Sequence, residues 1–234
     1  MSVKSETGSG PRPFEAGSGV NAKDEDQVRV WDPLVRYGHW FLALCFAVAY
    51  LSEGEPLWLH SWAGYGIGAY VMLRVLWGFA GPTPARFANF IAPPRAVLGY
   101  LRGLLTGSAQ RHLGHSPAGG AMVIALLFML AVTALSGMAL LAAEEGEGPL
   151  APLFANGQMR EISFITPARA DDDYETDGSH EGHEGAELLE EIHELAANLT
   201  LALVFLHLAG VAASSIAHRE NLPRAMVSGF KRRS

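Results

Sequence analysis

The sequence predicts an all-α membrane protein, a bundle of four transmembrane helices with both termini cytoplasmic and an acidic outer loop between helices 3 and 4. Three observations predict this fold class. The 234-residue chain is 49% hydrophobic but only 18% charged, which is unusual for a soluble protein. It holds four apolar stretches near the roughly 20 residues that a helix needs to cross a bilayer core of about 30 Å. Basic residues predominate in some of the loops and acidic residues in the others.

The predicted spans cover residues 33–51, 58–79, 118–143 and 187–217. The third is the clearest, because it has no ionisable side chain and begins just after Pro117. The fourth has its apolar centre between residues 195 and 217. The first two each carry one histidine near an end and tryptophans where the membrane surface is expected: Trp40, Trp58 and Trp77. Residues 95–105 have helical spacing with arginine on one side and predict a helix at the membrane surface.

The basic residues predict the orientation, because cytoplasmic loops carry an excess of lysine and arginine. The outer loop holds only two of them, Arg160 and Arg169. Twelve others lie before the first span, between the second and third, and after the fourth: Lys23, Arg29, Arg36, Arg86, Arg95, Arg102, Arg111, Arg219, Arg224, Lys231, Arg232 and Arg233. The loop 52–57 and the outer loop 144–186 are acidic and should face outward. We expect residues 1–30 to be a disordered cytoplasmic tail, 31–220 the membrane domain, and 221–234 a basic cytoplasmic tail.

Several kinds of protein are excluded by composition. Cys45 is the only cysteine, so the chain cannot form an internal disulfide, a four-thiolate iron–sulfur site or a Cys-x-x-Cys-His haem attachment. A net charge of -7 argues against nucleic acid, whose phosphates require a basic face. The first thirty residues contain no apolar stretch of the kind found in secretory signals, so no such signal is expected.

Four histidines, His39, His60, His193 and His207, fall within the predicted spans. Ionisable groups in transmembrane helices are costly and usually have a partner or a function. His193 and His207 are fourteen residues apart, which advances a helix by about 21 Å and turns it to within about 40° of four full turns. Both rings therefore leave one face near opposite membrane surfaces. From the chain direction, His60 should share the outer level with His193, and His39 the inner level with His207.

A facing pair of neutral imidazoles in a four-helix bundle can supply both axial ligands of a six-coordinate haem iron. Two pairs predict two haems, held non-covalently as b-type haem because the covalent attachment motif is missing. Zinc is the rival metal, but neither pair brings a full set of cysteine or carboxylate ligands for a tetrahedral site. Glu190 or Glu194 could assist only at the outer level. A purely structural contact between histidines is the third alternative.

Arg74 lies fourteen residues after His60, so the same arithmetic places it on that face at the depth of the inner pair. Its guanidinium could bind the propionates of an inner haem through paired hydrogen bonds, or it could extend to the cytoplasmic surface. The glycines Gly64, Gly66 and Gly68 have two alternatives as well. They could admit a flat macrocycle, or they could let helices pack closely.

The chain resembles the bacterial cytochrome b561 family, which includes the b-type cytochrome subunits of nickel–iron hydrogenases. The resemblance rests on these residues: Arg36-Tyr37-Gly38-His39-Trp40, His60, Arg74-Val75-Leu76-Trp77-Gly78-Phe79, Pro84-Ala85-Arg86-Phe87, Gly114-His115-Ser116-Pro117, His193 with His207, and Glu220-Asn221-Leu222. It covers about residues 29–233. The resemblance implies a four-helix di-haem cytochrome with the four histidines as axial ligands. It also implies that Arg36, Arg74 and His115 contribute to cofactor binding, with His115 beside a ligand or propionate rather than on the iron.

The expected function is transmembrane electron transfer between the membrane quinone pool and a redox partner protein, in the inner membrane of a bacterium. Two axial histidines leave iron no open position. The chain could act as a quinone oxidoreductase or as a subunit of a dehydrogenase or hydrogenase. Quinone is expected at the inner end, near Arg74, Arg86 and His115. The acidic outer loop could steer a basic periplasmic cytochrome or oxidoreductase, or could serve only for solvation. The sequence leaves open whether the chain forms a homodimer.

Two functions of other classes remain as alternatives. The first is a metal-binding or metal-transporting membrane protein, in which His180-Glu181-Gly182-His183-Glu184, beside Asp171 to Asp173, gathers divalent cations. The intramembrane histidines would then form a path. The second is a haem-free membrane anchor for a soluble enzyme. An absorption spectrum distinguishes both from a haem protein.

Overall fold

The computed structural model describes residues 27–52, 55–155 and 179–232. Four long helices dominate this part of the chain: α1 (Pro33–Ser52), α2 (Leu57–Ala80), α4 (Pro117–Glu144) and α6 (Ser179–Ala217). The smaller elements are β1 (Gln27–Arg29), the 3-10 turns η1 (Thr83–Ala85) and η2 (Phe87–Asn89), α3 (Pro94–Thr106), α5 (Ala151–Ala155), α7 (Leu222–Ser228) and β2 (Phe230–Arg232). Apart from the two short strands, the regular elements are helical, in agreement with the predicted class.

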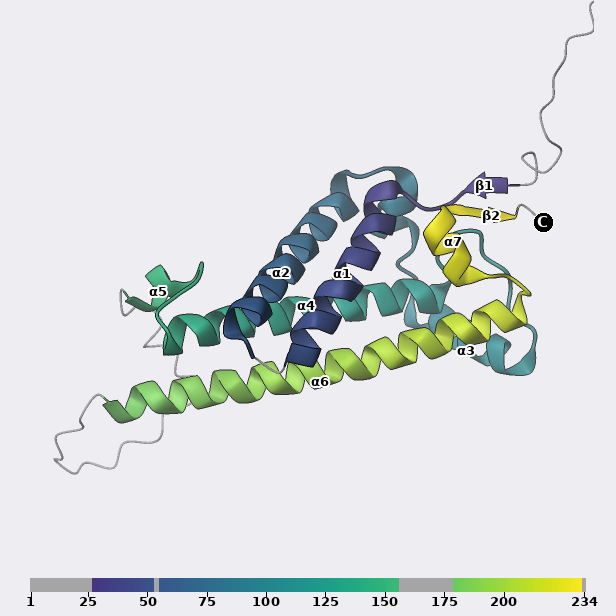
Figure 1. Cartoon of the computed structure of the whole chain (residues 1–234). Helices are drawn as coiled ribbons and strands as arrows, with labels where there is room; N and C mark the ends of the chain where they lie inside the picture. The colour runs from purple at the N-terminus through teal and green to yellow at the C-terminus, as the bar shows by residue number, and fades with distance from the viewer. Residues whose placement is uncertain (1–26, 53–54, 156–178, 233–234) are drawn as a thin grey trace, which may run out of the picture.

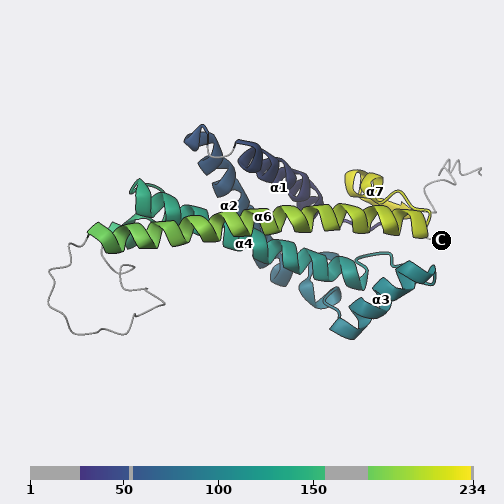
Figure 2. The ribbon, with the colours of Figure 1, turned by 90° about the horizontal axis from the view of Figure 1, so that it is seen from below.

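The long helices form two pairs. α4 and α6 lie along each other, whereas α1 and α2 lie side by side and cross them obliquely (Figures 1 and 2). α2 is the link between the pairs, because it packs against both α1 and α4. Its buried residues recur at helical spacing: Ala63, Ile67, Tyr70, Val71, Arg74 and Gly78. Ile67 and Val71 meet Leu130 and Ala134 of α4 in the apolar core.

Within the described residues, three helices are long and apolar enough to cross a membrane by length and composition: α1, α4 and the Gly185–Ala217 part of α6. α2 is long enough, with 24 residues, but His60, Arg74 and its glycines and aromatic residues lower its hydropathy. Its outer face is nevertheless apolar and exposed. The residues on that face include Trp58, Trp62, Met72, Leu76 and Phe79. The chain is thus a helical membrane protein, and the fourth span stays a prediction.

Local sequence signals explain where α4 begins and where α3 ends. α4 begins at Pro117 after Ser116, whose hydroxyl accepts a hydrogen bond from the Gly119 N–H at 3.1 Å, a regular N-cap. α3, which covers the predicted surface helix, ends at Gly107 with φ 73°, a left-handed conformation that favours glycine.

α6 begins at Ser179, eight residues before the predicted start at 187. The outer loop predicted at 144–186 is partly helical, because it contains α5 and the first turns of α6. Residues 179–186 contain no proline, which would interrupt a helix, and include two glutamates and an alanine, which favour it. Residues 156–178 of that loop lie outside the described part of the chain.

The first and last described segments meet in a small cap at the start of α1, formed by β1, α7 and β2. β1 pairs antiparallel with β2, with Val28 opposite Lys231, and the Val30 N–H donates to the Gly229 carbonyl at 3.0 Å. Residues 27–30, predicted as the end of a disordered tail, therefore have regular partners, and the predicted basic tail contains α7 and β2. Residues 1–26 lie outside the described part. Three-residue strands far apart in sequence leave no local pattern that could predict their pairing.

An ionic cluster holds the cap to the rest of the protein. Glu220, in the turn after α6, accepts a hydrogen bond from Arg111 Nε at 2.6 Å and lies 3.5 Å from Lys231 Nζ. Lys231 is only 8% exposed and also reaches the His112 carbonyl at 3.4 Å. Burial lowers the pKa of Lys231, and the Glu220 carboxylate opposes that shift. The cluster joins the loop before α4 to the turn after α6 and to β2.

Candidate cofactor sites

The four histidines of the predicted spans form two pairs in the structure. The rings of His60 on α2 and His193 on α6 have centroids 5.9 Å apart, with an interplanar angle of 73°. The rings of His39 on α1 and His207 on α6 have centroids 6.3 Å apart, with an angle of 55°. α6 is uninterrupted between its two histidines, so the pairs are separated by about 21 Å along this helix. The partners are those that the helical spacing predicted.

Hydrogen bonds fix the tautomers of the outer pair. His60 Nδ1 lies 2.9 Å from the Ala49 carbonyl oxygen, and His193 Nδ1 lies 2.9 Å from the Thr133 carbonyl oxygen. A carbonyl only accepts, so Nδ1 carries the proton in each ring and Nε2 keeps its lone pair. Metal-ligating histidines typically donate their second nitrogen in this way. The donor set of the outer pair therefore fits two axial ligands.

The inner pair contains an unsatisfied polar atom. His39 Nδ1 is buried and has no hydrogen-bond partner within the described residues. A buried nitrogen without a partner costs about 1–3 kcal/mol, so such an atom is expected where a further group completes the structure. This observation fits a cofactor between His39 and His207.

The glycines near the histidines sort into two kinds. Gly66 lies against Phe41 and Cys45, and Gly68 lies against Met138, so both serve close helix packing. Gly64, four residues after His60, and Gly210, three after His207, have no neighbouring atom within 4 Å of an added Cβ. Open space thus lies on the histidine-bearing face of α2 and α6, where a flat macrocycle needs room.

The zinc alternative finds no support in the described residues, which include no group of three or more His, Cys, Asp or Glu side chains that could hold a metal ion. A pair of imidazoles fits a metal whose other positions are filled by its own macrocycle. The second cluster of that alternative is not placed. Asp171 to Asp173 lie outside the described residues, as do the side chains of His180 to Glu184.

Arg74 is buried, with 4% of its surface exposed. Its Nη2 donates to the Ala85 carbonyl at 3.1 Å, and its guanidinium lies over the Phe87 ring at 5.0 Å. Nη1 is buried without a partner in the described part of the chain. The extension to the aqueous surface that the sequence left open is therefore not observed. Its contact with a propionate stays a prediction.

Arg36 points to the cap rather than along α1. Its Nη1 donates to the Ser228 carbonyl at 2.6 Å, and its Nη2 donates to the Tyr37 hydroxyl at 2.8 Å. Arg36 thus ties α1 to the C-terminal segment. Its predicted role toward a cofactor has no counterpart among these contacts and stays a prediction.

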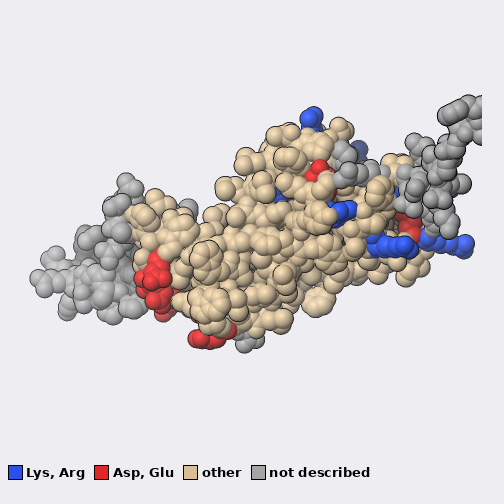
Figure 3. Space-filling model, turned by 45° about the horizontal axis from the view of Figure 1, so that its top comes forward, with Lys and Arg blue, Asp and Glu red and all other residues tan. Residues whose placement is uncertain are grey.

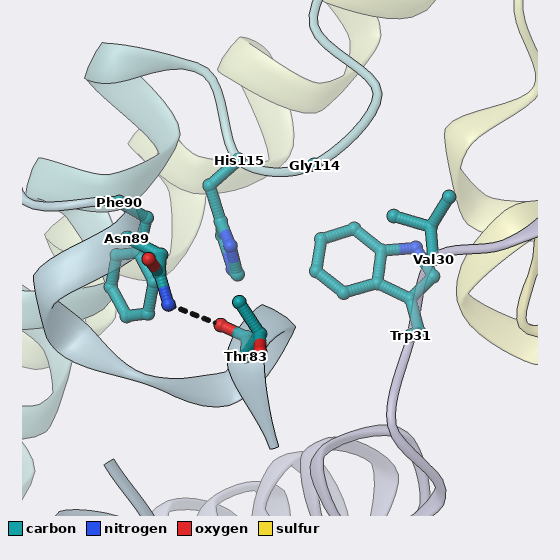
Figure 4. Close-up of a pocket in the computed structure, with 7 residues that line it drawn as sticks. All are labelled: Val30, Trp31, Thr83, Asn89, Phe90, Gly114 and His115. Carbon is teal, nitrogen blue, oxygen red and sulfur yellow. Dashed lines mark hydrogen bonds between the residues drawn. The ribbon is translucent and has the colours of Figure 1, made fainter. Parts of the chain in front are cut away.

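A cavity of about 250 Å³ lies beside His115, between the cap and the turns after α2 (Figure 4). The residues that line it are Val30, Trp31, Thr83, Asn89, Phe90, Gly114 and His115. The His115 ring packs on Phe90, with centroids 4.4 Å apart, and lies nearly perpendicular to the Trp31 ring, with centroids 4.8 Å apart. Asn89 Nδ2 donates to the Thr83 carbonyl at 2.5 Å. The sequence predicted His115 here but carried no signal for Trp31 or Asn89.

His115 makes the stability of this end depend on pH. Burial, with Arg74 and Lys231 nearby, lowers its pKa from 6.5 to about 4. Between these values the unfolded chain binds the proton and the folded chain does not, so stability falls as the pH falls from 6.5 to 4, by at most about 3 kcal/mol. Thermal unfolding measured across this range should show a smaller loss for His115→Gln than for the native chain. Equal losses would contradict this role.

The sequence profile of prokaryotic cytochrome b561 matches residues 30–229. The match includes both histidine pairs, Arg74 and the His115 cavity. No curated protein and no solved structure gives a significant match. The chain therefore belongs to the prokaryotic cytochrome b561 family, whose members are helical membrane proteins that transfer electrons across the membrane with b-type haem.

Proposed function

We propose that the chain carries electrons across the bacterial inner membrane through two b-type haems, between the quinone pool and a redox partner protein. One haem would be held by His60 and His193, the other by His39 and His207. The observation that carries this proposal is the pair of facing imidazoles at each of two levels of α6. Two rings on opposite sides of one metal, each bonded at about 2 Å, have centres roughly 6 Å apart. The centroid distances of 5.9 and 6.3 Å agree with this value.

The protein's task at these sites is to hold and orient. When bound, each haem supplies a one-electron ferric–ferrous couple. Two histidines per iron leave no open position for dioxygen or substrate, which suits electron transfer and excludes bond chemistry at the metal. Ala49 and Thr133 keep the outer rings in the tautomer that ligates. The separation of about 21 Å along α6 holds the two binding positions toward opposite sides of the hydrocarbon layer.

The proposed topology has four spans with both termini in the cytoplasm. Its support is the charge distribution: acidic side chains gather toward the end where α6 begins, and basic ones toward the cap (Figure 3). The exposed acidic residues at the first end are Glu144, Glu145, Glu147, Glu187, Glu190, Glu191 and Glu194. By the rule that basic loops stay inside, the cap lies in the cytoplasm. α2 would span because it packs between α1 and α4.

The cavity beside His115 is the proposed place for the quinone head group. It lies at the cytoplasmic end of the proposed topology, with Arg74 behind Phe90. Trp31 and Phe90 offer apolar ring surfaces, and His115 offers a ring nitrogen that stays neutral near pH 7. Such a nitrogen can exchange a hydrogen bond with a quinone oxygen. The acidic outer end would meet a basic redox protein, with an association rate that falls as salt is raised.

The purified protein tests the proposal through its absorption spectrum and haem content. We expect two non-covalent haems per chain and a dithionite-reduced spectrum of low-spin b-type haem, because both axial positions are histidine. Reduction by a quinol analogue should be slower in Trp31→Ala than in Trp62→Ala, whose tryptophan lies on the exposed face of α2. A colourless protein that binds zinc would support the metal-handling alternative, and a colourless protein without metal would support the anchor.

A further inference from the structure

We infer that α4, which contributes no histidine to either pair, positions His193 through the Thr133 carbonyl, the Ser136 hydroxyl and the absent side chain of Gly137. This inference rests on the proposed haem-binding role of the outer pair. The three residues of α4 would set the orientation and the tautomer of one haem ligand, His193.

The Thr133 carbonyl is the central contact. In an α-helix the carbonyl of one residue points toward the N–H of the fourth residue after it, so this oxygen lies beside Gly137. Glycine at 137 leaves room for a ring from α6 to reach that oxygen. His193 reaches it from α6 with Nδ1 at 2.9 Å. The bond fixes the proton on Nδ1 and leaves Nε2 for the metal.

Gly137 leaves the space that the ring occupies. A Cβ added there would lie 2.7 Å from His193 Cε1 and 3.0 Å from Nδ1, closer than van der Waals contact allows. The imidazole is the end of a side chain, so it would turn away before either helix moved. An alanine at 137 should therefore break the bond to the Thr133 carbonyl and misdirect Nε2.

Ser136 supplies a second oxygen. Its side chain is buried, at 7% exposure, and its hydroxyl donates to the Thr133 carbonyl at 3.1 Å. The Ser136 hydroxyl oxygen also lies 3.2 Å from His193 Nδ1. Because its proton is used by the carbonyl, its lone pairs face the Nδ1–H. Ser136 thus strengthens the preference for this tautomer without crowding the ring.

The position of α4 against α6 is itself held by a buried contact. Thr200 lies seven residues after His193, is fully buried, and has its Oγ1 3.3 Å from Thr133 Oγ1. Thr133 therefore contacts α6 at two positions. Its carbonyl meets His193, and its hydroxyl meets Thr200, about two helical turns further along the same face. No such support exists for His39, whose Nδ1 has no partner in the described residues. Changes in α4 should consequently affect the outer haem alone.

The test uses two variants of the full chain and one control. Gly137→Ala should lower the haem content from two to about one per chain, with the remaining haem at its native potential. Ser136→Ala should keep two haems and shift the potential and the low-spin EPR signal of one. Gly99→Ala, on α3 where an added Cβ meets no atom within 4 Å, should leave content and potentials unchanged.

The outcomes separate this inference from the proposed function. Two haems at native potentials in both Gly137→Ala and Ser136→Ala would overturn the inference while the proposed function stands. A native chain that binds no haem would overturn the proposed function itself. If Gly137→Ala is obtained only in low yield, the EPR and potential measurements on Ser136→Ala decide, because that change removes one oxygen and adds no volume.

Discussion

The His207→Ala variant should bind one haem per chain instead of two, and the haem that it keeps should have the potential of the outer site. Alanine removes the imidazole that faces His39 across the inner site, while the outer rings and their carbonyl partners lie about 21 Å away along α6. Haem content and an optical redox titration measure both quantities. The titration should change from two steps to one.

The two histidine pairs also predict the results of the other histidine variants. His39→Ala should give the same titration as His207→Ala, and the double variant should lose no further haem, because each single change already removes the inner site. His193→Ala should remove the other step. His218→Gln is the matched control, since this histidine follows the end of α6 and contacts Tyr100 rather than another imidazole. Loss of both haems from His207→Ala alone would contradict the independence of the two sites.

The helices and the histidine pairs were accessible to sequence reasoning for a simple reason. A long apolar run, a proline before it and a fixed helical period are local properties, and α6 keeps that period without a break from His193 to His207. Each partner then follows from the direction in which its helix runs. The same reasoning placed the start of α4, because Ser116 and Pro117 are local signals.

The remaining features depend on contacts that no local pattern encodes. The pairing of β1 with β2 joins segments about 200 residues apart, and it brings Trp31 to the His115 cavity. The Thr133 contact with His193 uses a backbone oxygen, which every residue possesses. The burial of Arg74 depends on the turns after α2, which fold back over its guanidinium. Each of these contacts joins segments that are distant in sequence or uses atoms that no residue type marks.

The Glu220→Gln variant should lose about 2–3 kcal/mol of stability, mainly in the cap. Lys231 and Glu220 have side chains only 6% and 11% exposed, and removal of one partner leaves the other charge buried and unpaired. Such a change costs about 3–5 kcal/mol for a fully buried pair, and the residual exposure reduces the figure. Hydrogen exchange measured by mass spectrometry should show faster exchange at the amides of residues 27–31 and 229–232, which form the strand pair and its continuation.

Glu191→Gln is the control for charge, because Glu191 is exposed near the other end of α6 and its replacement should change exchange at neither strand.

Loss of the Glu220 carboxylate should also affect function, because Lys231 lies on β2, β2 pairs with β1, and Trp31 follows β1. When β2 loosens, β1 loses its partner, and Trp31 no longer holds its ring against His115, where the centroids lie 4.8 Å apart. Reduction by a quinol analogue should then slow while haem content stays at two per chain. Unchanged or slower exchange at the two strands would contradict the predicted loss of stability. Loss of a haem would show that the cluster acts on the histidine pairs instead.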